Sequence, residues 1–271
     1  MIRSNLYYLA MASYSPQFTE AYTLTFGDRA ENHKGMQIIG TAAEYGFTEA
    51  ELISTQQWFH QHDRTCHIYD INSLLPFEYR TTVKPAYLLV AYQGLSAITD
   101  VDLMYQEQRG LAKDSQALMY GRVVDKHARH NLCFGEQSQA PNYQAGQGTV
   151  VAFQDVPRLN YLRQCWSTVV GNSANNLYAE GNYYHDLSKC GIGYHGDSER
   201  KKVIAVRLGA HFPLCYQWYY QSKPVGQRGI VSLGHGDIYM MSDKAVGYDW
   251  KLKNTLTLRH AAGADKYITP K

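Results

Sequence analysis

The sequence lacks the marks of a secreted, membrane-bound or repetitive protein. Its five cysteines include no C-x-x-C pair, which argues against a disulfide framework and a zinc site and favours a reducing compartment. No apolar run approaches the roughly 18 residues of a membrane span, and the run at residues 6–12, interrupted by Tyr7 and Tyr8, is short for a signal peptide. We therefore expect a soluble, intracellular protein, cytoplasmic or nuclear, without a membrane partner.

The sequence also lacks a strong net charge. The formal charge of its 271 residues is +2, so no nucleic-acid binder is identified, although a local basic face can be hidden in a neutral total. Hydrophobic residues make up 45% and charged residues 18%, a composition that folds into one large domain or two small ones. There is no repeat, and the composition leaves the oligomeric state undetermined.

Helix signals are found at two places. Thr48 and Glu51 have the spacing of a capping box, which predicts a helix from there to about Phe59. Asp155 is expected to cap a second helix, with Pro157 in its first turn. The apolar residues that follow at helical spacing are Leu159, Leu162, Trp166 and Val169.

Strand signals dominate the rest of the chain. Residues 87–92 form a short apolar run after Pro85, which predicts a buried strand. After Gly171, strand-like runs separated by turn residues follow one another at 177–179, 203–208, 214–220, 229–233, 237–241 and 254–258. Many short strands at regular spacing are typical of a sandwich or barrel.

The pair His195 and Asp197 is the first candidate for chemistry. Residues i and i+2 of a strand project to the same face, so one imidazole and one carboxylate can bind the same ion. They would be two of the three ligands of a 2-His-1-carboxylate site, which leaves positions open for a co-substrate and O₂.

The surroundings of this pair resemble the AlkB family of dioxygenases. An N-x-Y-x-x-G segment at 176–181 precedes it, and a glutamate follows at Glu199. An H-G-D strand begins at 235, and an N-T-L-T-L-R strand ends at Arg259. The ordered series covers about residues 120–263.

The resemblance implies a fold, a division of the chain and a set of cofactors. The fold would be α+β, with a double-stranded β-helix (jelly-roll) catalytic core, flanking helices and an N-terminal α/β extension. Residues 1–80 would be the extension, of unknown role, and residues 81–271 the dioxygenase domain. The cofactors would be Fe(II), the co-substrate 2-oxoglutarate, and O₂.

The resemblance also implies residue roles. His195 and Asp197 would be catalytic iron ligands, while Asn176 and Tyr178 would hydrogen-bond 2-oxoglutarate. Arg259 would pair with its distal carboxylate, for which a planar bidentate donor is suited. Residues 253, 255, 257 and 259 share one polar strand face, which we expect to look into the site. This adds Lys253 and Thr255 to the predicted cofactor-binding residues.

The second histidine that the family pattern requires is missing between residues 243 and 253. Asp249 is our first choice for the third ligand, because it lies on the expected adjacent strand and a carboxylate is an acceptable donor. His260 alternates away from the face of Arg259 and ranks second. A ligand from elsewhere, such as His185 or His211, and a chain that binds no metal remain open.

The substrate predicted from the resemblance is a nucleic-acid base, hydroxylated or oxidatively demethylated, in DNA or RNA. Arg122, Lys126 and Arg129 lie in a basic stretch that we expect to contact phosphates. Two alternatives stay open. One is a dioxygenase acting on a protein side chain or small molecule, and the other is a catalytically inactive AlkB-like binding module.

Overall fold

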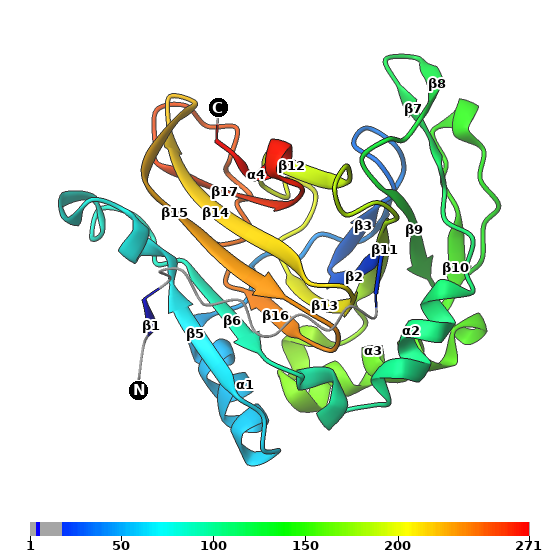
Figure 1. Cartoon of the computed structure of the whole chain (residues 1–271), viewed down its shortest axis with the longest axis horizontal. Helices are drawn as coiled ribbons and strands as arrows, with labels where there is room; N and C mark the ends of the chain where they lie inside the picture. Colours follow the sequence, from blue (N-terminus) through cyan, green and yellow to red (C-terminus); the bar gives the residue numbers. More distant parts are fainter. Residues whose placement is uncertain (1–3, 6–17, 271) are drawn as a thin grey trace.

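The computed structural model describes residues 4–5 and 18–270 of the chain. Strands in several sheets dominate this part, together with four α-helices, so the predicted α+β class is confirmed (Figure 1). The apolar run at residues 6–12 lies outside the described residues. Within the described part, no helix has both the length and the apolar character needed to cross a membrane.

The larger sheet has nine strands, of which β2 lies near the middle. In spatial order they are β1 (Ser4–Asn5), β5 (Cys66–Asp70), β6 (Tyr87–Ala91), β16 (Ile238–Met241), β13 (Val203–Gly209), β2 (Ala21–Gly27), β11 (Tyr178–Tyr184), β9 (His130–Gly135) and β10 (Val150–Ala152). The two end pairs, β1 with β5 and β9 with β10, are parallel, and the other neighbours are antiparallel. The centre of the sheet thus combines strands that are far apart in the sequence.

A second, four-stranded sheet covers one face of the first. Its order is β12 (Gly191–His195), β17 (Thr257–Gly263), β14 (Phe212–Tyr220) and β15 (Lys223–Leu233). Val203 and Ala205 of β13 share one hydrophobic cluster with Tyr216 and Trp218 of β14, so the two sheets pack face to face. Two small hairpins form sheets of their own: β3 (Arg29–Glu31) with β4 (Ile38–Gly40), and β7 (Gln116–Met119) with β8 (Arg122–Asp125). The first packs on the larger sheet through Ala30 and Ile39.

Helices cover the other face of the nine-stranded sheet, at the bottom of Figure 1. They are α1 (Glu49–Gln61), α2 (Val101–Arg109) and α3 (Pro157–Val169), while the short α4 (Asp265–Ile268) follows β17. Phe59 of α1, Met104 of α2 and Trp166 of α3 are fully buried in one cluster with Leu24 of β2. The core therefore has three layers: helices, the larger sheet and the smaller sheet.

Several local predictions are confirmed. Helix α1 begins after the N-cap Thr48, and both hydrogen bonds of the capping box with Glu51 are present. Strand β6 is buried along its whole length. Helix α3 has its predicted apolar face in the core, but its N-cap is Val156 without a side-chain bond. Asp155 instead accepts a hydrogen bond from Ser138, which holds the preceding turn.

The predicted boundary near residue 80 does not coincide with a break in the structure. Strand β2, from the expected extension, pairs along all seven of its residues with β11 and for most of its length with β13. Strand β5 pairs with β6 in the same sheet, across the boundary. The first 80 residues therefore supply an inner strand of the main sheet, and residues 81–271 do not form the sheet alone.

Candidate metal centre between the two sheets

Polar side chains line the inner face of the nine-stranded sheet. Because side chains alternate along a strand, Arg207 of β13 points to the same face as Val203 and Ala205, toward the smaller sheet. Thr23 of β2 is its register partner, and Asn182 of β11 is in turn opposite Thr23. A row of polar groups therefore crosses three neighbouring strands inside the core.

Three potential metal ligands meet at the edge of this interior. His195 ends β12, Asp197 follows two residues later, and His260 of β17 is the register partner of His195. Each imidazole Nε2 lies 3.5 Å from Oδ1 of Asp197. One ligand atom from each of the three residues lies within 4.8 Å of the others, an arrangement able to hold a metal ion. The side chains of Asp197 and His260 are almost fully buried, while that of His195 is 29% exposed.

Hydrogen bonds orient part of this triad. Nδ1 of His195 lies 2.7 Å from the carbonyl oxygen of Gly193, to which it can donate, and this tautomer leaves Nε2 free as a ligand. Nδ1 of His260 is buried and has no partner among the described residues. The backbone N–H of Asp197 donates to the carbonyl of Val246 at 3.0 Å, which fixes the carboxylate from the side of the loop before β17.

The protonation states of Asp197 and His260 suit metal binding. Burial by itself would raise the pKa of Asp197, but the charges of Arg200 and His260 and the hydrogen bonds from both imidazoles hold it well below its usual range. Burial, with the charge of His195, lowers the pKa of His260. An ionised carboxylate and a neutral imidazole are the forms that ligate a cation. The pKa of His195 is raised, because its bond to Asp197 outweighs burial.

A buried charge cluster stands behind Asp197. The guanidinium of Arg200 lies 2.7 Å from Glu180, 3.0 Å from Glu199 and 3.7 Å from Asp197. Burial raises the pKa of Glu31 to about 7, and the charges of Glu199 and Glu180 add to this shift. Three carboxylates share one guanidinium, so the cluster has an excess of negative charge that a divalent cation at Asp197 would balance.

Arg207 is the opposite case, a buried cation without a carboxylate. Its side chain is fully buried, and no acidic side chain of the described residues lies within ion-pair distance. One N–H donates to Oγ1 of Thr23, and Nε has no partner among the described residues. The rings of Phe212 and Tyr184 lie 5.2 and 6.0 Å from the guanidinium. A buried guanidinium without an anionic partner is a candidate site for an anionic ligand.

Tyrosines connect Arg207 with the triad. The ring of Tyr216 lies 6.1 Å from that of His260, and its buried hydroxyl has no partner among the described residues. Tyr239 feels the charges of both Arg207 and Asp197, and burial raises its pKa. Both hydroxyls therefore stay protonated at neutral pH, as hydrogen-bond donors between the metal site and the buried guanidinium.

The comparisons with known proteins show a family but no activity. No family model matches the sequence. A protein of Acanthamoeba polyphaga mimivirus, described as uncharacterized, is 47% identical over 252 residues, which cover 93% of this chain and 99% of the relative. This chain belongs to the family of that viral protein. The match leaves fewer residues uncovered than the 80 before the predicted boundary, so the sequence shared with this relative extends across that boundary.

Within this member of the family, the structure does not bring Asp249 to His195 and Asp197. Oδ2 of Asp249 lies 2.6 Å from Nζ of Lys244, and both side chains line a cavity on another side of the loop before β17. His260 stands where Asp249 was expected. The structure brings His260, rather than Asp249, beside His195 and Asp197, because the face of β17 that carries Leu258 and His260 is turned toward them.

The predicted 2-oxoglutarate residues are likewise not gathered at the triad. Asn176 is an exposed turn residue with φ of 54°, and Tyr178 packs in a small cluster with Ile39 and Cys133. Lys253 and Thr255 are exposed loop residues, because the expected strand begins only at Thr257. Arg259 lies on the other face of β17 from His260, with its guanidinium 4.1 Å from the ring of Tyr219 and 5.3 Å from Trp250.

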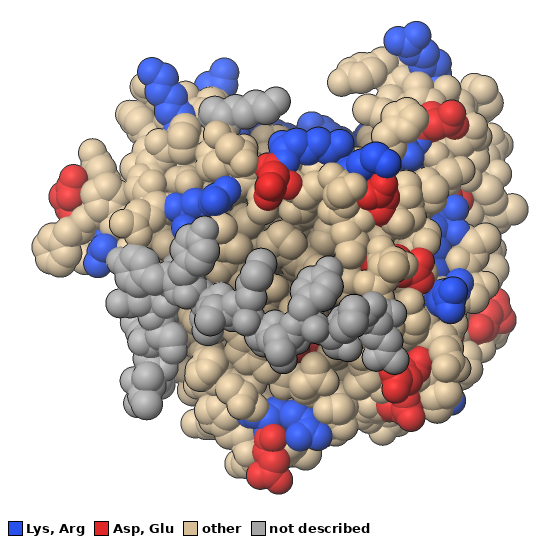
Figure 2. All heavy atoms as spheres, viewed as in Figure 1, with Lys and Arg blue, Asp and Glu red and all other residues tan. Residues whose placement is uncertain are grey.

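The predicted phosphate contacts do not form one surface. Arg122 is exposed on strand β8, but Lys126 is buried and donates to the side chains of Asn32 and Asn131 at 2.8 and 2.6 Å. Arg129 donates to Asn182 beside the candidate site. On the face drawn in Figure 2, outside the grey residues, lysines and arginines are interspersed with acidic residues. This face carries no continuous basic band.

The other two candidate histidines are engaged elsewhere. His185 packs against His130, with ring centroids 4.7 Å apart, and His211 lies near Ser232. Arg207 was missed altogether, although the sequence held a signal for it. It is the one charged residue in an otherwise apolar seven-residue strand, VIAVRLG, where a buried charge needs a reason.

Proposed function

We propose that the protein is an Fe(II)- and 2-oxoglutarate-dependent dioxygenase. The observation that carries the proposal is the group of His195, Asp197 and His260, two imidazoles and one carboxylate whose ligand atoms lie within 4.8 Å of one another. A 2-His-1-carboxylate set that occupies one side of an ion is typical of non-haem Fe(II) oxygenases. The excess negative charge around Arg200 fits a divalent cation at this place.

The co-substrate site that we propose lies deeper between the sheets. Arg207 would hold the distal carboxylate of 2-oxoglutarate, with Tyr239 as a further donor, since a buried unpaired guanidinium is suited to a carboxylate. When bound, iron and 2-oxoglutarate supply the oxidising power for insertion of oxygen from O₂ into a C–H bond. The chain's own contribution is to orient the carboxylate and, through Tyr216, Phe212 and Tyr184, to keep water from the interior.

We also propose an AlkB-like jelly-roll for the core. The smaller sheet and the central strands β16, β13, β2 and β11 give two facing sets of four strands, the number that a jelly-roll contains. One of these strands, β2, comes from the start of the chain. The arrangement would be a jelly-roll in which one inner strand of the main sheet, between β13 and β11, comes from the N-terminal part of the chain.

For the substrate we propose a nucleic-acid base. The ring of Trp250 lies beside Gly196, the residue between His195 and Asp197: a Cβ added at this glycine would lie 2.8 Å from Cδ1 of Trp250. Three cations surround this ring: Arg259 at 5.3 Å, Lys34 at 5.6 Å and Lys251 at 5.9 Å. An aromatic face beside basic groups is the pattern that accepts a stacked base and its phosphate.

The test of the metal site compares two single variants. We expect His260→Ala to lower the affinity for Mn(II), a stable substitute for Fe(II), by at least about tenfold, the effect of losing about 1.4 kcal/mol of binding free energy. Asp249→Asn should leave this affinity unchanged, because its carboxylate is paired with Lys244 outside the triad. Isothermal titration would measure both. Equal losses in the two variants would contradict the assignment of His260.

The test of the reaction follows succinate. The protein with Fe(II) and 2-oxoglutarate should release succinate under air, and methylated DNA or RNA oligonucleotides should raise the rate. The His260→Ala variant serves as the control. If no oligonucleotide raises the rate of succinate release, the proposed nucleic-acid substrate is refuted. If no succinate is released under any condition, the proposed dioxygenase activity is refuted.

A further inference from the structure

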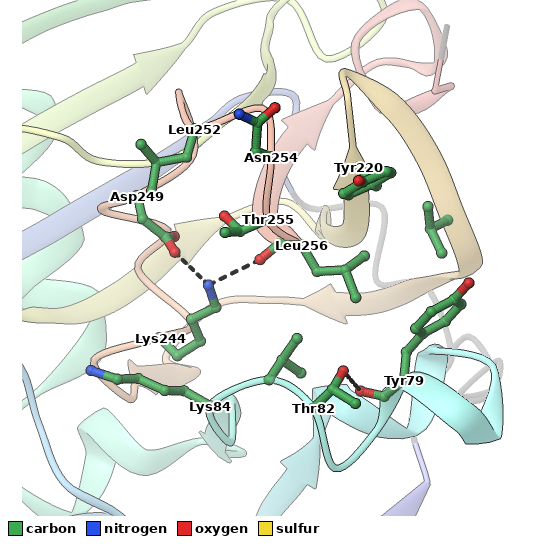
Figure 3. Close-up of a pocket in the computed structure, with 12 residues that line it drawn as sticks. Tyr79, Thr82, Lys84, Tyr220, Lys244, Asp249, Leu252, Asn254, Thr255 and Leu256 are labelled. Carbon is green, nitrogen blue, oxygen red and sulfur yellow. Dashed lines mark hydrogen bonds and ion pairs between the residues drawn. The ribbon is translucent and has the colours of Figure 1, made fainter.

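A second cavity lies outside the interior that holds the triad. It measures about 670 Å³, within the range of small-molecule sites. Its walls come from three places: the turn after the 3-10 helix Phe77–Tyr79, the connected ends of β14 and β15, and the loop between β16 and β17 (Figure 3). Neither His195, Asp197 nor His260 lines it.

The walls of this cavity are aromatic and aliphatic. Tyr79 and Tyr220 are 42% and 43% exposed, and the aliphatic residues Val83, Val225 and Leu256 also line the cavity. Figure 3 shows both tyrosine rings on the same side of the cavity. The hydroxyl of Tyr220 has no partner among the described residues. Large exposed rings beside aliphatic side chains offer a planar group a surface on which to stack.

One end of the cavity carries an ion pair. Nζ of Lys244 lies 2.6 Å from Oδ2 of Asp249 and 3.3 Å from the carbonyl oxygen of Leu256, with only 9% of the lysine side chain exposed. Oδ1 of Asp249 is itself buried and has no hydrogen-bond partner in the described part of the chain, while the side chain as a whole is one-third exposed. An ionised carboxylate accepts on both oxygens, so this end lacks an N–H or O–H donor.

A free cation stands at the rim. Lys84 is exposed and lines the cavity, and among residues 4–5 and 18–270 no acidic side chain lies within 4 Å of its ammonium. Figure 3 places Lys84 on the same side of the cavity as Lys244, away from the two tyrosines. The cavity thus combines a stacking surface, an acceptor that requires a donor, and a cation that can bind phosphate.

From these features we propose that the cavity is a binding site for a purine nucleotide, and specifically for a guanine base with a 5′-phosphate. Guanine carries adjacent N1–H and N2–H donors: one would donate to the unpartnered Oδ1 of Asp249, and the other would share Oδ2 with Lys244, since each carboxylate oxygen has two acceptor positions. The base lies against Tyr220 and Leu256, and the phosphate reaches Lys84. This proposal does not depend on the proposed oxidation, since the two sites share no residue.

The cavity lies on the other side of the loop between β16 and β17, which contacts Asp197. Lys244 and Asp249 flank Val246 and Gly247, and the carbonyl of Val246 accepts the N–H of Asp197 at 3.0 Å. The same short segment thus forms a wall of the nucleotide cavity on one side and holds the carboxylate ligand on the other.

Equilibrium titration of the full chain with guanosine monophosphate tests the site, and two related ligands act as matched controls. Inosine monophosphate lacks the 2-amino donor, and guanosine lacks the phosphate. We expect saturable binding of guanosine monophosphate, with each control weaker by about tenfold, since a hydrogen bond to a charged group contributes roughly 1.5–3 kcal/mol. Equal binding of all three ligands, or no saturable binding at millimolar concentration, would overturn the proposal.

Variants localise the binding. Tyr220→Ala and Lys84→Met should each lower the affinity for guanosine monophosphate. Lys84→Met should leave the affinity for guanosine unchanged. Lys223→Met is the control, an exposed lysine at the same hairpin end that does not line the cavity. His260→Ala should retain full affinity for guanosine monophosphate. A loss of affinity in His260→Ala, or unchanged affinity in Tyr220→Ala and Lys84→Met, would show that the nucleotide binds elsewhere and would refute this site.

Discussion

Replacing Arg207 by Met tests whether its buried guanidinium serves to bind a ligand or to stabilise the fold. In the ligand-free chain Arg207 is fully buried, with one hydrogen bond to Thr23 and an unpaired Nε. A buried donor without a partner costs roughly 1–3 kcal/mol, and more when it is charged. The aromatic faces of Phe212 and Tyr184 return about 0.5–2 kcal/mol of this. Met fills a similar space without a polar atom.

We therefore expect Arg207→Met to stabilise the protein in the absence of ligand. The free energy of unfolding should rise by about 1 kcal/mol, the part of the roughly 1–3 kcal/mol cost that the aromatic faces do not return, and the melting temperature by roughly 2–4 °C. Urea unfolding in the presence of a chelator measures the first quantity and calorimetry the second.

The same variant should no longer respond to the co-substrate. With Mn(II) and without O₂, 2-oxoglutarate at about 100 times its dissociation constant should stabilise the wild type by about 2.7 kcal/mol. Arg207→Met should show none of this stabilisation while still binding Mn(II). Arg259→Met is the control and should respond like the wild type, because Arg259 lies on the other face of β17. A variant that is destabilised and still responds to 2-oxoglutarate would refute our reading of Arg207.

Three further predictions follow from the structure. Gly196→Ala should lower the free energy of unfolding by about 1–3 kcal/mol in urea titrations, because the added methyl would lie 2.0 Å from the carbonyl oxygen of Gly247 and overpacking is costly. The same variant should weaken Mn(II) binding. An unchanged free energy of unfolding and an unchanged Mn(II) affinity would contradict this close contact. Glu31→Gln should raise the melting temperature of the metal-free protein at pH 8 but not at pH 4. The folded pKa of about 7 lies above the unfolded value of 4.5, so the proton favours folding below pH 4.5 and the wild type loses this stability between about pH 4.5 and 7; a difference independent of pH would contradict it. A chain beginning at residue 81 should not fold cooperatively, as circular dichroism would show, because it lacks β2 and β5; a cooperative melt would restore the predicted boundary.

Local features of the fold could be predicted from the sequence where local physics determines them. The capping box at Thr48 and the all-apolar run of β6 are such cases, because a helix start and a buried strand depend on neighbouring residues. The position of β2 between β13 and β11 has no local signal, since it depends on pairings about 150 residues and more away. For the same reason the sequence near residue 80 gives no sign that the strands on its two sides, β5 and β6, pair in one sheet.

The site was half visible in the sequence. The H-x-D pair was found because i and i+2 of a strand share a face, but the third position was assigned from the wrong face of β17. The polar face with Arg259 was expected to look inward, as in a site open to water. The inner face is the one with Leu258 and His260, because the site is set within the core and shares its apolar surroundings.

The place of β2 has a consequence for how the protein is made. This strand is synthesised among the first residues, yet both of its hydrogen-bonding edges remain open until β11 and then β13 have left the ribosome. During that interval its sequence AYTLTFG, largely apolar and β-prone, is exposed without a partner. The polar face that later completes the interior around Arg207 also forms last, so the newly made chain has to avoid aggregation before it can bind any cofactor. Slow synthesis or a chaperone that covers residues 21–27 should therefore raise the yield of folded protein more than a stronger promoter would.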